Sequence, residues 1–366
     1  MEADRQIWLT LSDDISRICD LLPSNEGRMS MVTSLIKAFQ LHKFFQIVEI
    51  GNVLAKELET YHDAKFVNCL MRNRTNLDKT LPNYSEISKI VKSWSLSTML
   101  DEDESECGSD SDIEEESSED VEQLEQFGLK YDCFPFPFMS QYVKSTAGSS
   151  IYAAKALIRA NSNGKQNIAI NWYGGRHHCT KHKASGYCYV NDVILAIGLL
   201  RKSFDKVFYL DLDLHHGDGV ELGYRYSRKV YTCSIHRYDV GFFPGTGSLE
   251  SCQPNQINIP TKRGLCDESM NFILTDIVIP LINKFQPNVL VVQMGCDGLG
   301  TDVHKEWNLT IKGFGDIMNL LLQHVNVPVL ILGGGGYNHT ETAKCWSYIT
   351  KTIIQDTSEW DLIPEH

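Results

Sequence analysis

Acidic and histidine residues crowd the end of one apolar segment of this chain. The segment Val207-Phe-Tyr-Leu-Asp-Leu-Asp-Leu-His-His-Gly-Asp-Gly runs from apolar residues directly into three Asp and two His. Burying unpaired charge is costly, and a bound metal ion would compensate that cost. Because side chains alternate along a strand, Asp211, Asp213 and His215 should point to one face. We expect Asp213 and His215 to share one ion, with Asp211 behind it.

A second apolar segment ends in the same manner. Val289-Leu-Val-Val-Gln-Met-Gly-Cys-Asp finishes on Asp297. A single Asp at a strand end is more often a helix cap or a structural ion pair. Together with Asp213 and His215, however, it gives two carboxylates and one imidazole, which leave coordination positions open for water and substrate. We therefore predict a catalytic zinc site at Asp213, His215 and Asp297.

Two adjacent histidines form another candidate group. Asn171-Trp-Tyr-Gly-Gly-Arg-His-His places His177 and His178 after a further apolar run. A neutral imidazole can take a proton from water, and a neighbouring imidazolium can stabilise charge or protonate a leaving amine. Each ring needs an orienting partner on its far nitrogen, and Asp211 and Asp218 are the carboxylates available. A lone His here would more often be structural, but the doublet with spare acids favours catalysis.

Four consecutive glycines precede a tyrosine in Leu332-Gly-Gly-Gly-Gly-Tyr337. Glycine lets the backbone approach a ligand closely, so the Tyr337 hydroxyl can be aimed at a developing oxyanion. A phosphate cradle is the competing interpretation. The Lys-Ser/Thr pair that would support it does not follow.

The elements that must position these residues alternate from residue 149 onward. Short β-rich apolar runs between helices predict a parallel sheet covered on both faces, whose ligand crevice lies beyond the carboxyl ends of the strands. We expect strands at 167–171, 206–212, 230–235, 289–294 and 328–332, and helices at 150–160, 189–200, 268–285, 311–325 and 342–354. Upstream, apolar spacing predicts an amphipathic helix in 29–45.

The formal charge of −13 belongs to one segment. Residues 101–125 contain fourteen Asp and Glu and no Lys or Arg, and without them 34 basic residues face 33 acidic ones. We predict a disordered acidic insertion at about 99–126 within a single domain over 1–366. The balanced remainder gives no electrostatic reason to expect direct nucleic-acid binding.

The cysteine pattern and the short length of the apolar runs predict the cellular location of the protein. Eleven cysteines, an odd number without a Cys-x-x-Cys pair, suit free thiols in a reducing environment. No window reaches the roughly 18 apolar residues of a membrane span, and the first residues contain no apolar signal segment. We expect a soluble intracellular protein that does not act at a membrane.

Several long motifs resemble, in the same order, the zinc-dependent class I histone deacetylases. The resemblance covers about 29–66 and 128–352 and leaves the acidic insertion outside. It rests on Asn171-Trp-Tyr-Gly-Gly-Arg-His-His, Ala184-Ser-Gly-Tyr-Cys-Tyr-Val-Asn-Asp, Asp211-Leu-Asp-Leu-His-His-Gly-Asp-Gly-Val, Gly241-Phe-Phe-Pro-Gly-Thr-Gly and Gly333-Gly-Gly-Gly-Tyr.

The family implies an arginase-like α/β fold with an eight-stranded parallel sheet, and hydrolysis of N-ε-acetyl-lysine to lysine and acetate. By resemblance, His178 is the general base, His177 its histidine partner and Tyr337 the carbonyl-polarising tyrosine. Asp218 and Asp211 would orient His178 and His177 respectively.

The resemblance also implies residues that bind substrate and a second ion. Gly186, Tyr187 and Phe243 match the walls of the narrow lysine channel, and Asp132 matches the acid that holds the substrate backbone at the rim. A structural potassium ion would be held by the remaining set: Asp211, Asp213, His215, Ser234 and Ile235.

Two departures from the family pattern concern the channel mouth. Arg176 and His304 stand where class I enzymes usually carry an apolar residue or Pro, so we expect a more polar rim. The sequence looks most like the fungal Hos-type branch and its metazoan relative. This implies acetylated histone tails or an acetylated cohesin subunit as substrate, a corepressor complex as a candidate partner, and a location in the nucleus, with the cytoplasm as a second location.

Three rival functions stay open. An arginase-type enzyme would need further carboxylates for a second manganese ion, but Gly217, Gly295 and Leu299 flank the predicted ligands. An acetylpolyamine or other small-molecule amidohydrolase would share the chemistry and differ only at the rim. A catalytically silent scaffold that recruits partners through the acidic loop would have no need of buried charge.

Overall fold

The computed structural model describes residues 5–72, 82–100, 118–160 and 165–356. Its strands form one sheet of eight, in the order β2-β1-β3-β8-β7-β4-β5-β6, and every neighbouring pair is parallel. This confirms the predicted fold class. The strands are β1 (Arg5–Leu9), β2 (Gln46–Ile47), β3 (Gln166–Asn171), β4 (Val207–Asp211), β5 (Val230–Arg237), β6 (Gln256–Thr261), β7 (Val289–Gln293) and β8 (Val329–Leu332).

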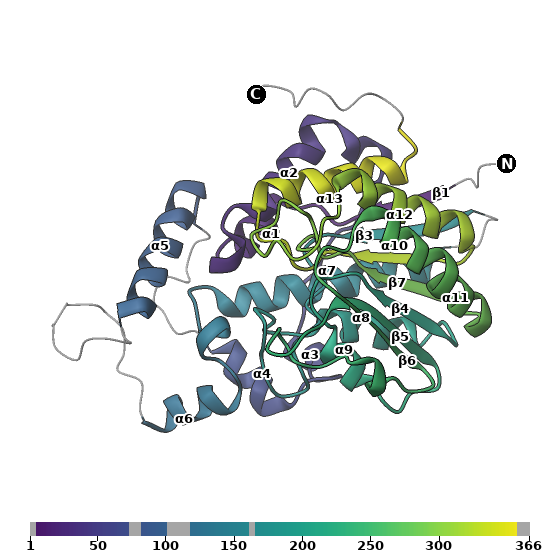
Figure 1. The fold of residues 1–366 in the computed structure, drawn as a ribbon. Helices are drawn as coiled ribbons and strands as arrows, with labels where there is room; N and C mark the ends of the chain where they lie inside the picture. The colour runs from purple at the N-terminus through teal and green to yellow at the C-terminus, as the bar shows by residue number, and fades with distance from the viewer. Residues whose placement is uncertain (1–4, 73–81, 101–117, 161–164, 357–366) are drawn as a thin grey trace.

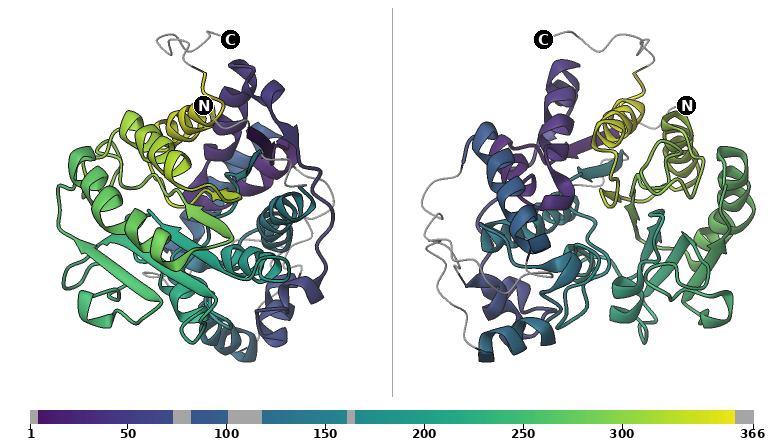
Figure 2. Two further views of the ribbon diagram at one scale, coloured as in Figure 1. Left: turned by 90° about the vertical axis from the view of Figure 1, so that its right-hand side faces the viewer. Right: turned by 60° about the vertical axis from the view of Figure 1, so that its left-hand side comes forward.

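Helices surround the sheet on both faces, as Figures 1 and 2 show. They are α1 (Asp13–Cys19), α2 (Arg28–Ala38), α3 (Ala55–Leu58), α4 (Ala64–Met71), α5 (Tyr84–Leu100), α6 (Ser118–Gln126), α7 (Met139–Arg159), α8 (Asp192–Leu200), α9 (Asp218–Gly223), α10 (Asp267–Ile273), α11 (Ile279–Phe285), α12 (Ile311–His324) and α13 (His339–Ile353).

The central strands are buried on both faces, which explains their continuous apolar sequences. In β4, Val207 and Tyr209 pack into a core with α7 and α8, whereas Phe208 and Leu210 pack into the core beneath α12 and α13. In Figure 1 the sheet lies between these two helical layers. Alternate residues along each strand therefore pack against different helical layers. Polar site residues can then lie only at the strand ends.

The predicted elements agree with the structure except at some boundaries. The helix expected over 29–45 ends at Ala38, and the one expected over 268–285 is α10 and α11 joined by a π-helical turn, Leu274–Val278. Sequence reasoning missed β1, β2 and β6. β6 alternates Gln, Ile, Asn, Ile, Pro and Thr at the edge of the sheet, so it lacks the continuous apolar run of the central strands.

The predicted acidic insertion at 99–126 lies mostly outside the described residues. Its last part, however, is the helix α6, where we had expected disorder. Leu124 is buried, and the buried ring of Phe127 lies 5.5 Å from the ring of Phe66. These apolar contacts explain why the end of an acidic stretch folds onto the body. Figure 1 shows α5, which precedes the insertion, apart from the central sheet.

Within the described ranges, no helix is both long enough and apolar enough to cross a bilayer. The cysteines that fall in those ranges are all free thiols.

Candidate active site

The predicted chemistry gathers at the carboxyl ends of four adjacent strands, β3, β8, β7 and β4. The sheet order places these strands side by side, and their parallel direction brings their carboxyl ends to one edge. β3 leads to His177 and His178, β4 to Asp213 and His215, and β7 to Asp297. Residues separated by more than a hundred positions therefore meet because the strand order, and not the chain order, decides which ends are neighbours.

Asp213, His215 and Asp297 form a compact buried group. Their candidate ligand atoms all lie within 4.8 Å of one another, and no other group of this kind occurs among the described residues. The Nδ1 atom of His215 is 3.3 Å from Asp213 Oδ1 and 2.9 Å from Asp297 Oδ2. Both carboxylates are almost fully buried, at 1% and 0% exposure.

The electrostatics of this group favour a cation. Burial, followed by the neighbouring charge of Asp213, raises the pKa of Asp297 to about 6. Burial alone would lower the pKa of His215, but the carboxylates of Asp213 and Asp297 raise it to about 10. The two carboxylates thus favour a positive charge on the His215 ring between them. A divalent cation supplies the same positive charge with a suitable donor set, so the triad fits a divalent metal site.

Other side chains and a backbone N–H hold the triad in place. Gln293 Nε2 and the N–H of Gly335 each donate to Asp213 Oδ2 over 2.8 Å. The ring of Phe242 stacks on that of His215, with centroids 5.4 Å apart. Sequence reasoning missed Gln293 and Phe242. The signal for Gln293 was a polar residue inside an otherwise apolar buried strand.

His177 pairs with Asp211 behind the metal group. Its Nδ1 lies 2.8 Å from Asp211 Oδ2, which also accepts a 2.6 Å hydrogen bond from the Tyr209 hydroxyl. Burial lowers the pKa of His177, but the carboxylates of Asp211 and Asp213 outweigh it and raise that pKa to about 9. His177 is therefore an imidazolium at neutral pH.

His178 pairs with Asp218 and has the opposite ionisation. Its Nδ1 lies 2.7 Å from Asp218 Oδ1. Burial and the charge of His177, whose ring centroid is 3.9 Å away, lower the pKa of His178 to about 4. At neutral pH this ring is uncharged, and its free nitrogen can accept a proton.

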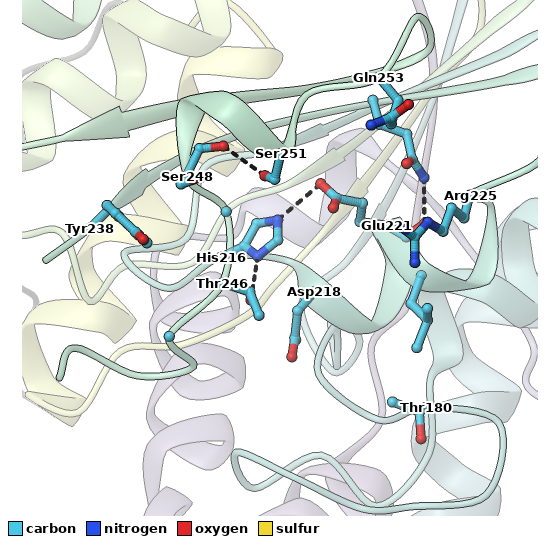
Figure 3. A pocket seen from close by; sticks show the side chains of 14 residues that line it. Thr180, His216, Asp218, Glu221, Arg225, Tyr238, Thr246, Ser248, Ser251 and Gln253 are labelled. Atoms are coloured by element: carbon cyan, nitrogen blue, oxygen red, sulfur yellow. Dashed lines mark hydrogen bonds and ion pairs between the residues drawn. The ribbon is translucent and has the colours of Figure 1, made fainter. Parts of the chain in front are cut away.

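Asp218 also borders a separate pocket of about 410 Å³ (Figure 3). There His216 hydrogen-bonds to Thr246 Oγ1 at 2.8 Å and to Glu221 Oε2 at 3.1 Å, as the dashed lines show. The Asp218 side chain lines this pocket and retains 26% exposure.

Tyr337 borders the site through His304, whose ring centroid lies 5.2 Å from that of His215. Asp302 Oδ2 accepts from the N–H of Tyr337 at 2.7 Å, and Asp302 Oδ1 lies 2.9 Å from Nδ1 of His304. The His304 ring packs edge-on against Tyr337 with centroids 4.8 Å apart. Burial raises the pKa of Tyr337 well above its ordinary value, so the hydroxyl keeps its proton.

The predicted channel residues lie beside His178 and Tyr337. The ring of Phe243 is 4.9 Å from that of His178, and Tyr187 is 5.9 Å from Tyr337. Gly186 has a φ of +55°, and a Cβ there would lie 2.4 Å from the His178 ring, so only glycine fits. The Asp132 carboxylate accepts from the N–H of Gly186 at 2.7 Å.

The residues predicted to hold potassium also lie at the end of β4. Ser234 pairs with Asp211 across the β4–β5 ladder, and its neighbour Ile235 continues β5. The N–H of Gly217 donates to Ser234 Oγ at 3.4 Å, and that of Asp213 donates to Asp211 Oδ1 at 3.2 Å. The potassium ion itself stays a prediction.

The expectation that Arg176 lies at the channel mouth is wrong. Arg176 is 5% exposed as a whole residue, whereas the side chain of His304 is 32% exposed. Arg176 directly precedes His177, but its backbone N–H donates to the buried Asp192 and its side chain turns into the interior. Sequence adjacency to a site residue did not reveal the direction of this side chain.

The comparisons with known proteins agree with this geometry. Residues 22–353 match the histone deacetylase domain. Histone deacetylase HOS1 of Saccharomyces cerevisiae is 33% identical over 387 residues, covering 94% of this chain and 82% of that protein. Histone deacetylase 8 of Xenopus tropicalis is 34% identical over 361 residues, covering 97% and 85%. The chain therefore belongs to the histone deacetylase family, a family of hydrolases.

Proposed function

We propose that this chain hydrolyses N-ε-acetyl-lysine on proteins, with a single zinc ion at Asp213, His215 and Asp297 as its cofactor. The observation that carries the proposal is the buried triad beside two His–Asp pairs of opposite ionisation. Zinc bound there would act as a Lewis acid toward the amide carbonyl and water. Two carboxylates and one imidazole suit this ion and leave coordination positions open.

His178 is the general base in this proposal. It is uncharged at neutral pH, and its Nδ1 is occupied by Asp218, which leaves Nε2 to take a proton from the attacking water. The Asp218 carboxylate fixes the tautomer and the orientation of the ring. His178 then delivers the proton to the leaving amine.

His177 and Tyr337 stabilise charge on the two sides of the reacting carbonyl. His177 carries a positive charge that Asp211 holds in place, so it stabilises negative charge that develops nearby. Tyr337 keeps its proton and donates a hydrogen bond to the oxyanion. Asp302 accepts from the backbone N–H of Tyr337, which helps to fix the chain segment that carries this side chain.

The channel explains the choice of an acylated lysine. Gly186, Tyr187 and Phe243 would wall a narrow passage beside His178, which Gly186 and Phe243 contact. A neutral acyl-lysine can enter such an aromatic passage, whereas a free ammonium group would have to lose its hydration. Asp132, already bound to the Gly186 N–H, would hold the substrate backbone at the rim.

The protein substrate, the partners and the location belong to the same proposal. The relatives HOS1 and histone deacetylase 8 are named as histone deacetylases, which supports acetylated histone tails, with an acetylated cohesin subunit as the second candidate. We place the protein in the nucleus, with the cytoplasm as a second location, in a corepressor complex and without direct contact to nucleic acid. A structural potassium ion would bind near Asp211 and Ser234, and residues 1–366 would form one domain.

The test is a comparison of substrates on the purified, zinc-loaded chain. We expect acetate release from acetyl-lysine peptides to exceed release from acetylated polyamines, and Tyr337→Phe to lower it strongly. Faster release from acetylpolyamine would replace the protein substrate by a small molecule. No release from either class, with zinc bound, would favour a scaffold.

A further inference from the structure

A second buried cluster borders the reaction site and contains donors without acceptors. Arg28, Arg176 and Tyr142 are 1%, 5% and 0% exposed. The Nε and Nη2 atoms of both arginines and the hydroxyl of Tyr142 are buried and have no hydrogen-bond partner. Unpartnered buried groups of this kind are rare and demand an explanation, such as an ion or a ligand.

These side chains lie close enough for their charges to act on one another. After burial, the charge of Arg176 is the next largest cause that lowers the pKa of Arg28, to about 10. Arg176 is also the largest charge that opposes the raised pKa of Tyr142 and of the neighbouring Cys19 thiol. Two guanidinium groups therefore share one buried region.

No carboxylate within the described residues accepts a hydrogen bond from either guanidinium. Arg28 donates through Nη1 to the carbonyl of Gly336 at 2.8 Å and lies over the ring of Trp346 at 5.0 Å. Asp192, whose charge reaches Arg176, already accepts from the N–H groups of Gly175 and Arg176. Asp20, whose charge reaches Arg28, likewise accepts from the N–H groups of Met29 and Ser30. The guanidinium donors are therefore left without acceptors, which an anion would supply.

The cluster adjoins the reaction site through two chain segments. Arg176 immediately precedes His177, and Gly336, the acceptor for Arg28, immediately precedes Tyr337. The charge of Arg28 also reaches the Tyr337 hydroxyl. An anion held by the two arginines would therefore lie next to the residues that surround the reacting carbonyl.

The planar fork of guanidinium matches a carboxylate, which it binds through two parallel hydrogen bonds. We propose that Arg28 and Arg176 bind the terminal carboxylate of a dicarboxylic acyl group, so that this site removes succinyl-type groups from lysine in addition to acetyl groups. The inference rests on the proposed function, because it assigns an acyl class to the same reaction centre. The buried Arg176 is the residue that makes the region doubly cationic.

The reaction is the same hydrolysis with a different acyl group. Water adds across the amide bond, the carbon–nitrogen bond breaks, and a proton passes to the lysine nitrogen. The products are a lysine amine and a free dicarboxylate, and no other co-reactant is needed. An uncharged acyl group of similar length would leave the two arginines without an anion.

The test compares peptides that carry acetyl-, butyryl-, malonyl-, succinyl- or glutaryl-lysine on the zinc-loaded chain. We expect one dicarboxylic acyl peptide to be hydrolysed at least about tenfold faster than butyryl-lysine, since buried charge-assisted hydrogen bonds are strong. Arg176→Leu should lower the ratio of dicarboxylic-acyl to acetyl hydrolysis at least about tenfold, and Arg176→Lys should restore part of it. Arg201→Leu is the matched control. Arg201 follows the C-terminal end of α8, whereas Asp192 begins that helix, so this variant should keep the ratio.

A binding measurement keeps the inference separate from the proposed function. Thermal unfolding of the zinc-loaded chain with sodium succinate, acetate or chloride at equal ionic strength does not require turnover. Stabilisation by succinate that exceeds the other anions and is lost in Arg176→Leu would support the carboxylate site even if acetyl-lysine were not hydrolysed. Equal stabilisation by all three anions, or acetyl hydrolysis with dicarboxylic acyl peptides no better than butyryl, would overturn it.

Discussion

Two buried polar clusters meet at residues 176–178, and they differ in what they lack. Around Asp213 and Asp297 the side chains are mainly acceptors, and they raise the pKa of His215. Around Arg28 and Arg176 they are donors, and burial, followed by the charge of Arg176, lowers the pKa of Arg28. The first cluster therefore suits a cation, and the unpartnered guanidinium donors of the second suit an anion.

His177 and His178 are adjacent in the sequence but also differ in ionisation. Both rings donate from Nδ1–H to an Asp carboxylate, yet the pKa is about 9 for His177 and about 4 for His178. His177 has a second carboxylate 3.8 Å from its Nε2, that of Asp213, whereas His178 faces the charged His177. A single orienting acid therefore does not fix the ionisation of a buried imidazole.

The largest expected effect comes from removing one acceptor of the first cluster. Asp297→Asn keeps the shape of the side chain but removes half of the negative charge beside His215. Loss of an outer partner of a metal ligand typically costs 10–100-fold in affinity, so we expect loss of a direct ligand to cost more than about 100-fold in zinc affinity. Competition with a chromophoric chelator measures this, with Asp302→Asn as a control that removes a buried carboxylate outside the triad. Wild-type zinc affinity in Asp297→Asn would contradict the assignment.

The next effect separates metal binding from proton transfer. His178→Ala removes the neutral imidazole, and positioned general bases contribute about 10²–10⁴-fold, so kcat should fall in that range. Zinc affinity should change little, because His178 is outside the triad. Parallel zinc titration and acetate-release kinetics check both. A variant that loses zinc and turnover together would assign His178 a structural role.

A smaller effect on catalysis is expected from a change in the wall of the proposed lysine channel. In Gly186→Ala the new Cβ would lie 2.4 Å from the His178 ring and 3.0 Å from Phe243, at a φ that favours glycine. The catalytic ring must shift, and misplacement of about 1 Å can cost around 100-fold, so we expect kcat/KM to fall by about 10–100-fold. Steady-state kinetics on an acetyl-lysine peptide measure the change. Unaltered kcat/KM would contradict a close contact between residue 186 and the His178 ring.

The smallest effect is expected at His62, outside the active site, where burial also shifts the pKa of a histidine. His62 accepts from the N–H of Asn191, and burial lowers its pKa from 6.5 to about 4. The unfolded chain then binds the proton first, so stability is complete above pH 6.5 and is lost as pH falls toward 4. Between pH 7.5 and 5 this loss is about 2 kcal/mol, at 1.36 kcal/mol per pKa unit. Urea unfolding of wild type and His62→Gln isolates it, and an equal loss in both proteins would exclude His62 as the source.

The strand-end residues were predictable because their sequence pattern is local. The apolar run that becomes β4 leads directly into Asp211, Asp213 and His215, and parallel topology then brings its end beside that of β7. The candidate triad could therefore be assembled from two segments without any structural information. Its fit to a divalent cation follows from distances that only the structure provides.

The remaining features depend on contacts that are distant in sequence. Arg176 was expected at the rim, yet it lies inside, next to Arg28 from α2. The helix α6 was expected to be disordered because its composition is acidic, but Leu124 and the following Phe127 bury apolar surface. In both cases a tertiary contact overrides the tendency of the local sequence, and only the structure reveals it.

The most direct test of the central claim is acetate release from an acetyl-lysine peptide as metal-free protein is titrated with zinc. The account predicts that turnover rises to a plateau at a single equivalent of zinc, and that His178→Ala binds the same amount without comparable turnover. Turnover that needs no metal, or that survives in His178→Ala at the wild-type rate, would contradict it.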